Sequence, residues 1–461
     1  MNTKDVRPSQ ITAATTITVV IAVAWLVMPH PIFIVAICFA PLAILLVLNQ
    51  TFWLVTLFVI FSFFRIHEAF PVIYNFKIPL LLSLGALGAL SFHLLISRQL
   101  TVYWHPSLKW LFIFWALVII SIAFASSRDI AITAFKNTYW KIIVMTLAIT
   151  WLITTPKQLA QMSKAIMVAG LLVGLVALYN ASNGIDLVEG TRVSIGRSFG
   201  SMLGDPNDLA LVLMFPLAFT VSQLVEIRSS IWIRGFALLT CLILFLSILE
   251  TQSRGGLLGA LSVFGYFTSK HIRSRTLLVI LTLVAALSLY IIAGIDVRVS
   301  GGGAEAGIDA SAMGRLYAWE AAFKMALDNP LTGVGLENFY YNYFFYSSHW
   351  DGVNHAVHST WFGVLAETGF VGLIVFIALI VSLVKTSLRS ISLLTKQSDI
   401  TLSVGANAVI SGLIGTIVSG TFLTQGFVWP IYILAALTIV INRIVQTDCQ
   451  NEKAEYSQIQ K

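Results

Sequence analysis

The chain has 461 residues, of which 57% are hydrophobic and 11% are charged, and its formal net charge is +7. A soluble protein of this length needs far more charged surface, so the composition excludes a soluble globular enzyme. Apolar runs of about 18–20 residues recur along the chain, and each can cross a hydrocarbon core of roughly 30 Å. The sequence therefore predicts an all-α polytopic membrane protein with a single integral membrane domain over residues 1–461.

The predicted membrane spans follow one another along the chain, and we expect about 12–14 of them because some runs are short. They lie at residues 10–28, 31–48, 51–64, 78–97, 107–125, 138–153, 162–180, 206–225, 231–249, 255–269, 276–294, 359–384, 401–420 and 427–445. The first span follows a short basic tail without a convincing cleavage site. We interpret it as a retained anchor.

Lys and Arg in the short loops predict the orientation of the spans. With the N-terminus in the cytoplasm, most of the 28 basic residues fall on the cytoplasmic side, including the cluster at 270–275. Both termini are then cytoplasmic, and the loops at 182–208 and 295–357 lie outside. The positive net charge follows from this topology and requires no nucleic-acid partner. Cys38 and Cys241 fall within apolar spans, so no outer disulfide framework is expected.

The loop at 295–357 is the longest polar stretch, and it contains a predicted helix at 311–327. Apolar residues recur there at helical spacing, and Asn329-Pro330 ends the pattern. Such a helix can lie along the membrane surface, with Arg315 and Trp319 one turn apart on the same side.

Two arginines and two histidines in the outer segments are candidates for chemistry. Arg254, in ETQSRGG (250–256), can bind an anion through its planar guanidinium, or it can snorkel to the interface or pair with Glu250. An arginine such as Arg315 in an outer loop is most often simply solvated. His355 and His358 can each act as a general base or bind a nearby carbonyl. His358 adjoins a predicted span and is the better placed.

The stretch GDPNDLAL (204–211) has the pattern of a helix start. Asp205 caps, Pro206 occupies the first turn, and Asp208 lies near the positive end of the helix dipole. A metal site from the two aspartates would need more ligands than the sequence displays, so we favour the structural interpretation.

Three stretches resemble the superfamily of O-antigen ligases and polysaccharide polymerases, which are bacterial inner-membrane proteins. The stretches are TQSRGG (251–256), GRLYAWEAAFKMALDNPLTGVGLENF (314–339) and VHSTWFGVLAETGFVGLIVF (357–376). Their order, spacing and predicted outer location agree with the family pattern, and the resemblance runs from about residue 160 to residue 390. Where this chain has Ser359, the family usually has asparagine after its histidine.

The resemblance implies a GT-C-like, lipid-sugar type of glycosyltransferase that is inverting, metal-independent and free of cofactors. Its donor would be a glycan on undecaprenyl diphosphate. Its acceptor would be a sugar hydroxyl of the lipid A core for a ligase, or a lipid-linked glycan for a polymerase of O-antigen or exopolysaccharide. By the same resemblance His358 would be the general base, and Arg254 and Arg315 would hold the diphosphate. The site would face the periplasm from the inner membrane, among membrane lipids.

Further residues are candidate substrate contacts: Arg192, Arg197, Trp319, His355 and Glu367. Glu367 can also anchor His358, nine residues before it. The aromatic residues at 340–346 can stack against sugar rings or form an interfacial belt. A different class of function, a carrier for a lipid-linked sugar, would need charged residues in the middle of spans. Because the charged residues lie mostly at span ends and in loops, we favour it less.

Overall fold

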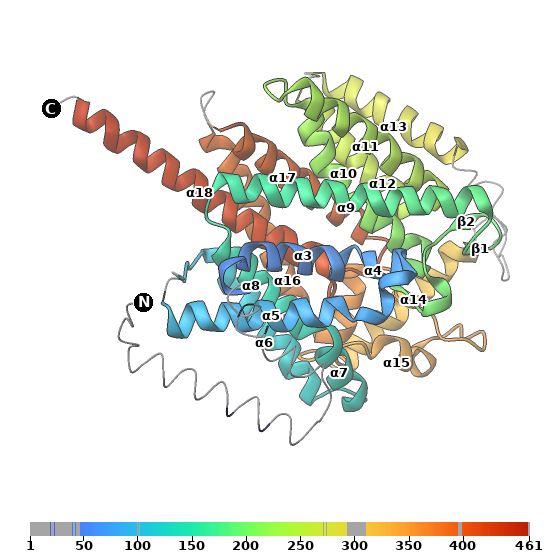
Figure 1. Cartoon of the computed structure of the whole chain (residues 1–461). Coiled ribbons are helices and arrows are strands. Elements are labelled where there is room, and N and C mark those ends of the chain that lie inside the picture. The colour runs from blue at the N-terminus through green and yellow to red at the C-terminus, as the bar shows by residue number, and fades with distance from the viewer. Residues whose placement is uncertain are drawn as a thin grey trace.

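The computed structural model is drawn in Figure 1. It describes residues 47–98, 100, 102–270, 272, 274–292, 310–394 and 399–459, with a few isolated positions before residue 47. Eight helices in this part of the chain are long and apolar enough to cross a membrane. The prediction of an all-α polytopic membrane protein is confirmed.

The first half of the described chain is helical apart from its turns. Its elements are α3 (Thr51–Phe63), α4 (Ile66–Ala69), η1 (Pro71–Phe76), α5 (Ile78–Ser91), η2 (Phe92–Ile96), α6 (Pro106–Ala123), α7 (Arg128–Ala134), η3 (Phe135–Tyr139), α8 (Trp140–Leu152) and α9 (Pro156–Asn183). A short antiparallel hairpin follows, in which β1 (Leu187–Val188) pairs with β2 (Arg192–Val193).

The second half contains most of the long helices. Its elements are η4 (Arg197–Phe199), η5 (Met202–Gly204), α10 (Pro206–Val225), α11 (Ile231–Glu250), α12 (Arg254–Ser269), α13 (Arg275–Ile292), α14 (Ala310–Asp328), α15 (Phe339–Tyr346), α16 (Thr360–Leu393), α17 (Ile400–Gly420) and α18 (Trp429–Ile459). The helix expected at 311–327 corresponds to α14.

The predicted spans differ from the observed helices mainly in length. Those expected at 51–64, 138–153 and 255–269 are α3, α8 and α12, which have 13, 13 and 16 residues. They are shorter than the roughly 20 residues that a bilayer core requires. Conversely, α9 and α16 have 28 and 34 residues and extend beyond their apolar runs. The spans expected at 10–28 and 31–48 lie almost entirely outside the described residues.

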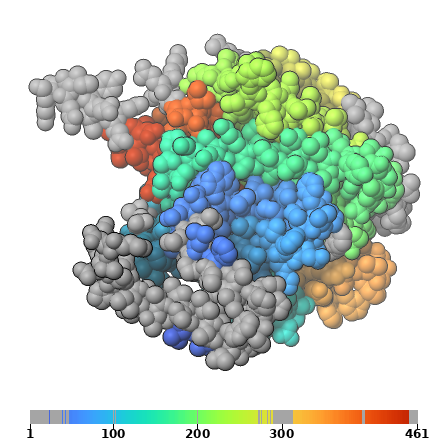
Figure 2. All heavy atoms as spheres, viewed as in Figure 1, coloured from blue at the N-terminus to red at the C-terminus, as the bar shows by residue number. Residues whose placement is uncertain are grey.

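Two enclosed helices form the centre of the bundle. Helix α10 packs against α9, α11, α12 and α17, and α18 packs against α8, α16 and α17. Glycines allow the closest approaches: a Cβ on Gly170 would lie 2.4 Å from Pro216, and one on Gly256 would lie 2.4 Å from Ala210. Small residues at such crossings are typical of membrane bundles. Helix α9 forms a continuous band across the face shown in Figure 2.

The hairpin, α4, α14 and α15 lie together at one end of the bundle (Figure 1). Hydrogen bonds connect the segments at this end. Ser126 N donates to Val334 O over 3.0 Å, and Thr360 Oγ1 donates to Leu423 O over 2.8 Å. The basic-residue pattern predicts that all of these segments lie on one side of the membrane.

Helix α16 is interrupted at Gly369, where φ is 70° and ψ is −173°. The turn at 330–339 fits into this interruption. Phe370 N donates to Pro330 O over 2.9 Å, and Val334 N donates to Ala366 O over 2.8 Å. We call the contact between the 330–339 turn and the break in α16 the clasp. It explains why the Asn-Pro, Gly-x-Gly and Glu-x-Gly patterns occur together: they are the two halves of one contact.

We predict that Gly369→Ala destabilises the protein by about 2–4 kcal/mol. The backbone conformation at Gly369 is strained for any residue with a side chain, and the new Cβ would lie 2.5 Å from Pro330 O. Thermal unfolding of the purified protein in detergent measures the loss. The matched control is Gly88→Ala in α5, where an added Cβ meets no atom within 4 Å. Equal melting temperatures for the two variants would contradict the clasp.

Candidate active site

A cavity of about 320 Å³ opens among the segments at this end of the bundle. Its charged lining consists of one imidazole and four carboxyl groups: His358, Asp205, Asp208, Glu337 and Glu367. These residues come from three separate parts of the chain, with further lining from the connection between α17 and α18. The cavity therefore depends on the tertiary fold and on no single local motif.

His358 is the residue immediately before the cap of α16. Its φ of 44° is in the left-handed region, which costs a non-glycine residue of order 1–3 kcal/mol. Neighbours on both sides hold this conformation. Trp319 Nε1 donates to Val357 O over 3.0 Å, and Thr360 Oγ1 accepts from Gln425 N over 2.9 Å. The position of the imidazole is thus determined by packing against α14 and against the 421–428 connection.

Burial lowers the pKa of His358 below its ordinary value of 6.5, and the positive charge of Arg315 lowers it further. The carboxylate of Asp205 acts in the opposite direction. Because the pKa is lowered, the imidazole is neutral near pH 7 and can accept a proton. Asp205 lines the same cavity as His358, and the charge of Arg192 also lowers the pKa of the imidazole. Arg315 reaches this position because it precedes Trp319 by one turn of α14.

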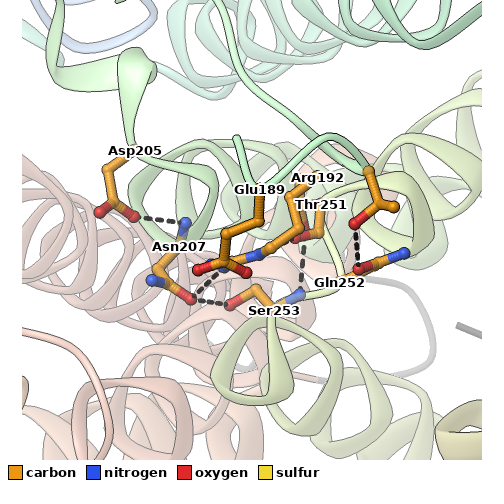
Figure 3. Close-up of polar contacts among 8 residues, drawn as sticks. Glu189, Arg192, Asp205, Asn207, Thr251, Gln252 and Ser253 are labelled. Atoms are coloured by element: carbon orange, nitrogen blue, oxygen red, sulfur yellow. Dashed lines mark hydrogen bonds and ion pairs between the residues drawn. The ribbon is translucent and has the colours of Figure 1, made fainter. Parts of the chain in front are cut away.

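Arg192 is the centre of a hydrogen-bond network beside the cavity (Figure 3). It is 3% exposed. Its Nε donates to Thr251 O over 3.1 Å, and its Nη2 donates to Asn207 Oδ1 over 3.1 Å. The same Asn207 oxygen accepts from Ser253 Oγ over 2.9 Å. The network joins the hairpin to the first turns of α10 and α12, and Asn207 itself lines the cavity.

The residues of TQSRGG each have a local role at the start of α12. Ser253 caps the helix by accepting from Gly256 N over 3.2 Å, so Arg254 is the first helical residue. Gln252 has a left-handed φ of 49°. Gly255 lies against the 421–428 connection, because a Cβ there would come within 3.3 Å of Leu423. Within the described residues, the cavity lining includes His358 but neither Arg254 nor Arg315. Arg254 is linked to the cavity through Ser253 and Asn207.

The carboxylate of Glu367 accepts from Glu337 N over 2.8 Å and from Phe339 N over 3.5 Å. It therefore anchors the turn of the clasp, whereas the sequence suggested an anchor for His358. Glu337 has a left-handed φ of 57°, and its side chain faces the cavity. Partial desolvation in the cavity raises the pKa of Glu337 above its ordinary value.

The remaining predicted residues lie away from the cavity. His355 pairs with Asp351 over 2.9 Å and meets the ring of Tyr343 edge-on. Arg197 is exposed at the start of η4. Trp319 supports the site from α14 and stacks on Phe362.

The structure adds three carboxyl groups that sequence reasoning did not place in the site: Asp205, Asp208 and Glu337. The expected cap is observed, since Asp205 Oδ1 accepts from Asn207 N over 2.7 Å. The same segment also faces the cavity. Across the described parts of the chain, no group of three or more His, Cys, Asp or Glu side chains is arranged to hold a metal ion.

Residues 239–377 match a protein-family model described as O-antigen ligase. This segment of the chain is similar to O-antigen ligases. The match contains Arg254, Arg315 and His358, together with both halves of the clasp. No curated protein matches the chain.

The matched segment supplies only part of the cavity. Asp205, Asn207 and Asp208 precede the matched segment, and Thr424 and Phe427 follow it. Arg192 also lies before the match, yet it donates to the backbone of Thr251 inside it. The positions of the site residues in the matched segment thus depend on contacts with parts of the chain outside residues 239–377.

We predict that Asn207→Ala lowers the free energy of unfolding by about 1–3 kcal/mol, because it leaves buried donors of Arg192 and Ser253 without their acceptor. Asn207→Asp, which keeps an acceptor oxygen, should lose less. Thermal unfolding in detergent measures both. Asn183→Ala is the control, since that exposed amide bonds only within the end of α9. A loss no greater than that of the control would show that the network is not stabilising.

Proposed function

We propose that the protein is an O-antigen ligase-like glycosyltransferase. It transfers a glycan from undecaprenyl diphosphate to a sugar hydroxyl of the lipid A core, at the periplasmic face of the bacterial inner membrane. The observation that carries the proposal is the half-buried imidazole of His358, which lines a cavity and is acted on by the charges of Arg315 and Arg192, within a segment that matches the O-antigen ligase family.

In the proposed reaction the acceptor hydroxyl oxygen attacks the anomeric carbon of the donor sugar. The new C–O bond forms as the bond between that carbon and the phosphate oxygen breaks. The hydroxyl proton passes to His358, and the electron pair of the broken bond leaves with undecaprenyl diphosphate. Attack on the face opposite the leaving group inverts the anomeric centre. A positioned base of this kind contributes about 10²–10⁴ in rate.

Two guanidiniums would stabilise the negative charge that develops on the leaving diphosphate. Arg254 begins α12, where the helix dipole adds to its charge, and Arg315 approaches from α14. With these two cations in place the proposed mechanism uses no metal ion and no cofactor. Arg192 has a supporting role: by holding Thr251 O and Asn207, it positions the segment that carries Arg254.

The membrane bundle fits a lipid-linked donor. The polyprenyl tail can remain among the bilayer lipids while its diphosphate reaches the end of the bundle where the cavity opens. The loop charges support an orientation with both termini in the cytoplasm and the cavity in the periplasm. A polymerase would use the same residues with a lipid-linked glycan as acceptor. Loss of chain attachment to the lipid core in a deletion strain indicates a ligase, and loss of chain elongation indicates a polymerase.

We predict that His358→Ala abolishes glycan transfer in a purified system while donor binding persists, because the base is lost and the cations remain. Arg254→Ala and Arg315→Ala should instead raise the donor concentration needed for half-maximal rate. His349→Ala is the matched control, an exposed histidine of the same loop that stacks on Tyr317. Unchanged turnover in His358→Ala would show that His358 is not the general base. Unchanged donor kinetics in both arginine variants would show that Arg254 and Arg315 do not hold the diphosphate.

We also predict a pH dependence of the transfer rate. The neutral imidazole is the active form, so the rate is constant near neutral pH and falls as the pH drops through the lowered pKa of His358. Arg315 lowers this pKa and Asp205 raises it. Arg315→Gln should therefore move the acidic limb of the pH–rate profile to higher pH, and Asp205→Asn should move it to lower pH. If the acidic limb of the profile lies at the same pH in both variants as in the wild type, the assignment of His358 as the general base is contradicted.

A further inference from the structure

A second cavity, of about 550 Å³, adjoins the first. The two share four lining residues, which form the boundary between them: Met202, Glu337, Phe427 and Val428. The other walls come mainly from α7 and η3, with contributions from α15 and from the start of α18. Most of this lining lies outside the segment that matches the ligase family.

One face of α7 and η3 presents polar side chains to the second cavity. Asp129, Thr133 and Asn137 follow one another at intervals of four residues, and all three are exposed. Within the described part of the protein, none of these three side chains has a hydrogen-bond partner. Their carboxylate, hydroxyl and amide groups are therefore available to a ligand. The face ends in a π-helical turn at η3, and such turns are frequent at functional sites.

Four aromatic residues line the second cavity, Tyr139, Tyr341, Phe427 and Trp429, and of these Tyr341 alone is exposed. Tyr341 is 55% exposed on α15, and Trp429 is at the start of α18. A sugar ring has hydroxyls around its edge that both donate and accept hydrogen bonds, and an apolar face that packs on an aromatic ring. The combination of a carboxylate, an amide and hydroxyls with the exposed ring of Tyr341 matches that chemistry.

The charges of the second cavity exclude the diphosphate. Its acidic residues are Asp129 and Glu337, and its cation, Arg65, is engaged with Glu68 over 2.5 Å. By contrast, arginines lie beside the first cavity: Arg192 contacts its lining residue Asn207, and the charge of Arg315 acts on His358. The lining of the first cavity is also rich in carboxyl groups, so a dianionic leaving group is attracted to the arginines beside that cavity and to the lining of neither. An uncharged sugar is accepted by both.

The clasp holds the boundary between the cavities. Glu367 fixes the backbone of Glu337, and the next residue, Asn338, fixes the start of α7. Asn338 Oδ1 accepts from Ser127 N over 2.9 Å, and its Nδ2 donates to Ser127 O over 3.2 Å. The turn that faces His358 thus also determines where Asp129 lies.

We propose that the second cavity binds the acceptor sugar, and that Asp129 and Asn137 bind its hydroxyls while Tyr341 packs against its ring. The bound sugar presents one hydroxyl past Glu337 to His358. This proposal rests on the proposed glycosyltransferase function, which it completes by separating a donor side with arginines from an acidic acceptor side that takes an uncharged sugar.

Equilibrium binding to the purified full chain tests the proposal. The probes are the lipid-free core oligosaccharide, a single lipid-free O-antigen repeat unit, and inorganic pyrophosphate. The wild type should bind one of the two sugars as well as pyrophosphate. The double variant Asp129→Ala/Asn137→Ala should weaken sugar binding about tenfold or more, the loss expected for two hydrogen bonds, and leave pyrophosphate binding unchanged.

Lys136→Ala is the matched control, because this exposed residue of η3 does not line the second cavity. It should bind both ligands as the wild type does. Tyr341→Ala, a single exposed substitution, serves as a second variant and should also weaken sugar binding. Unchanged sugar affinity in both variants, or no sugar binding by the wild type, would overturn the proposal.

Failure of the proposed function gives a different pattern. Arg254→Ala and Arg315→Ala should lose pyrophosphate and keep the sugar, whereas His358→Ala should keep both. If the sugar is lost in Asp129→Ala/Asn137→Ala while His358→Ala still transfers glycan, the base assignment fails and the sugar site stands. If His358→Ala is inactive while the Asp129→Ala/Asn137→Ala and Tyr341→Ala variants bind and use the acceptor normally, the proposed sugar site is wrong and the proposed function stands.

Discussion

The arrangement of this site depends on one contact, the insertion of the 330–339 turn into the break of α16 at Gly369. A helix that crosses a membrane satisfies its own backbone, so a break in it must be filled by partners from elsewhere. Here Pro330 O and Val334 N supply those partners. His358 immediately precedes the N-cap of α16, and Glu337 lies in the inserted turn. The clasp thereby positions two walls of the first cavity. Through Asn338 it also positions the start of α7.

The clasp gives the ligase motifs a physical explanation. The residues of Asn-Pro, Gly-x-Gly and Glu-x-Gly form the support, whereas His358, Arg254 and Arg315 are the groups to which we propose to assign the chemistry. Three residues beside or within these motifs, Gln252, Glu337 and His358, have left-handed backbones without being glycine. Strain of this kind persists when surrounding contacts determine the conformation, and it is found most often at functional sites.

The membrane fold was largely predictable because its signals are local. The spans expected at 206–225, 231–249 and 401–420 agree with α10, α11 and α17 to within a residue or so, since each apolar run ends at polar residues. Helix α9 begins earlier than expected because Thr155 and Gln158 form a capping box ahead of the apolar run. The carboxyl groups were harder to predict. Asp208 and Glu337 reach one cavity only through tertiary packing, which no local pattern reports.

The central claim is that the donor diphosphate binds between Arg254 and Arg315 with its sugar directed at His358. A structure of the full chain with bound undecaprenyl diphosphate tests it most directly. The account predicts phosphate oxygens within hydrogen-bond distance of both guanidiniums, at the edge of the cavity that contains His358. Diphosphate bound elsewhere, for example beside Asp129 in the second cavity, would contradict it.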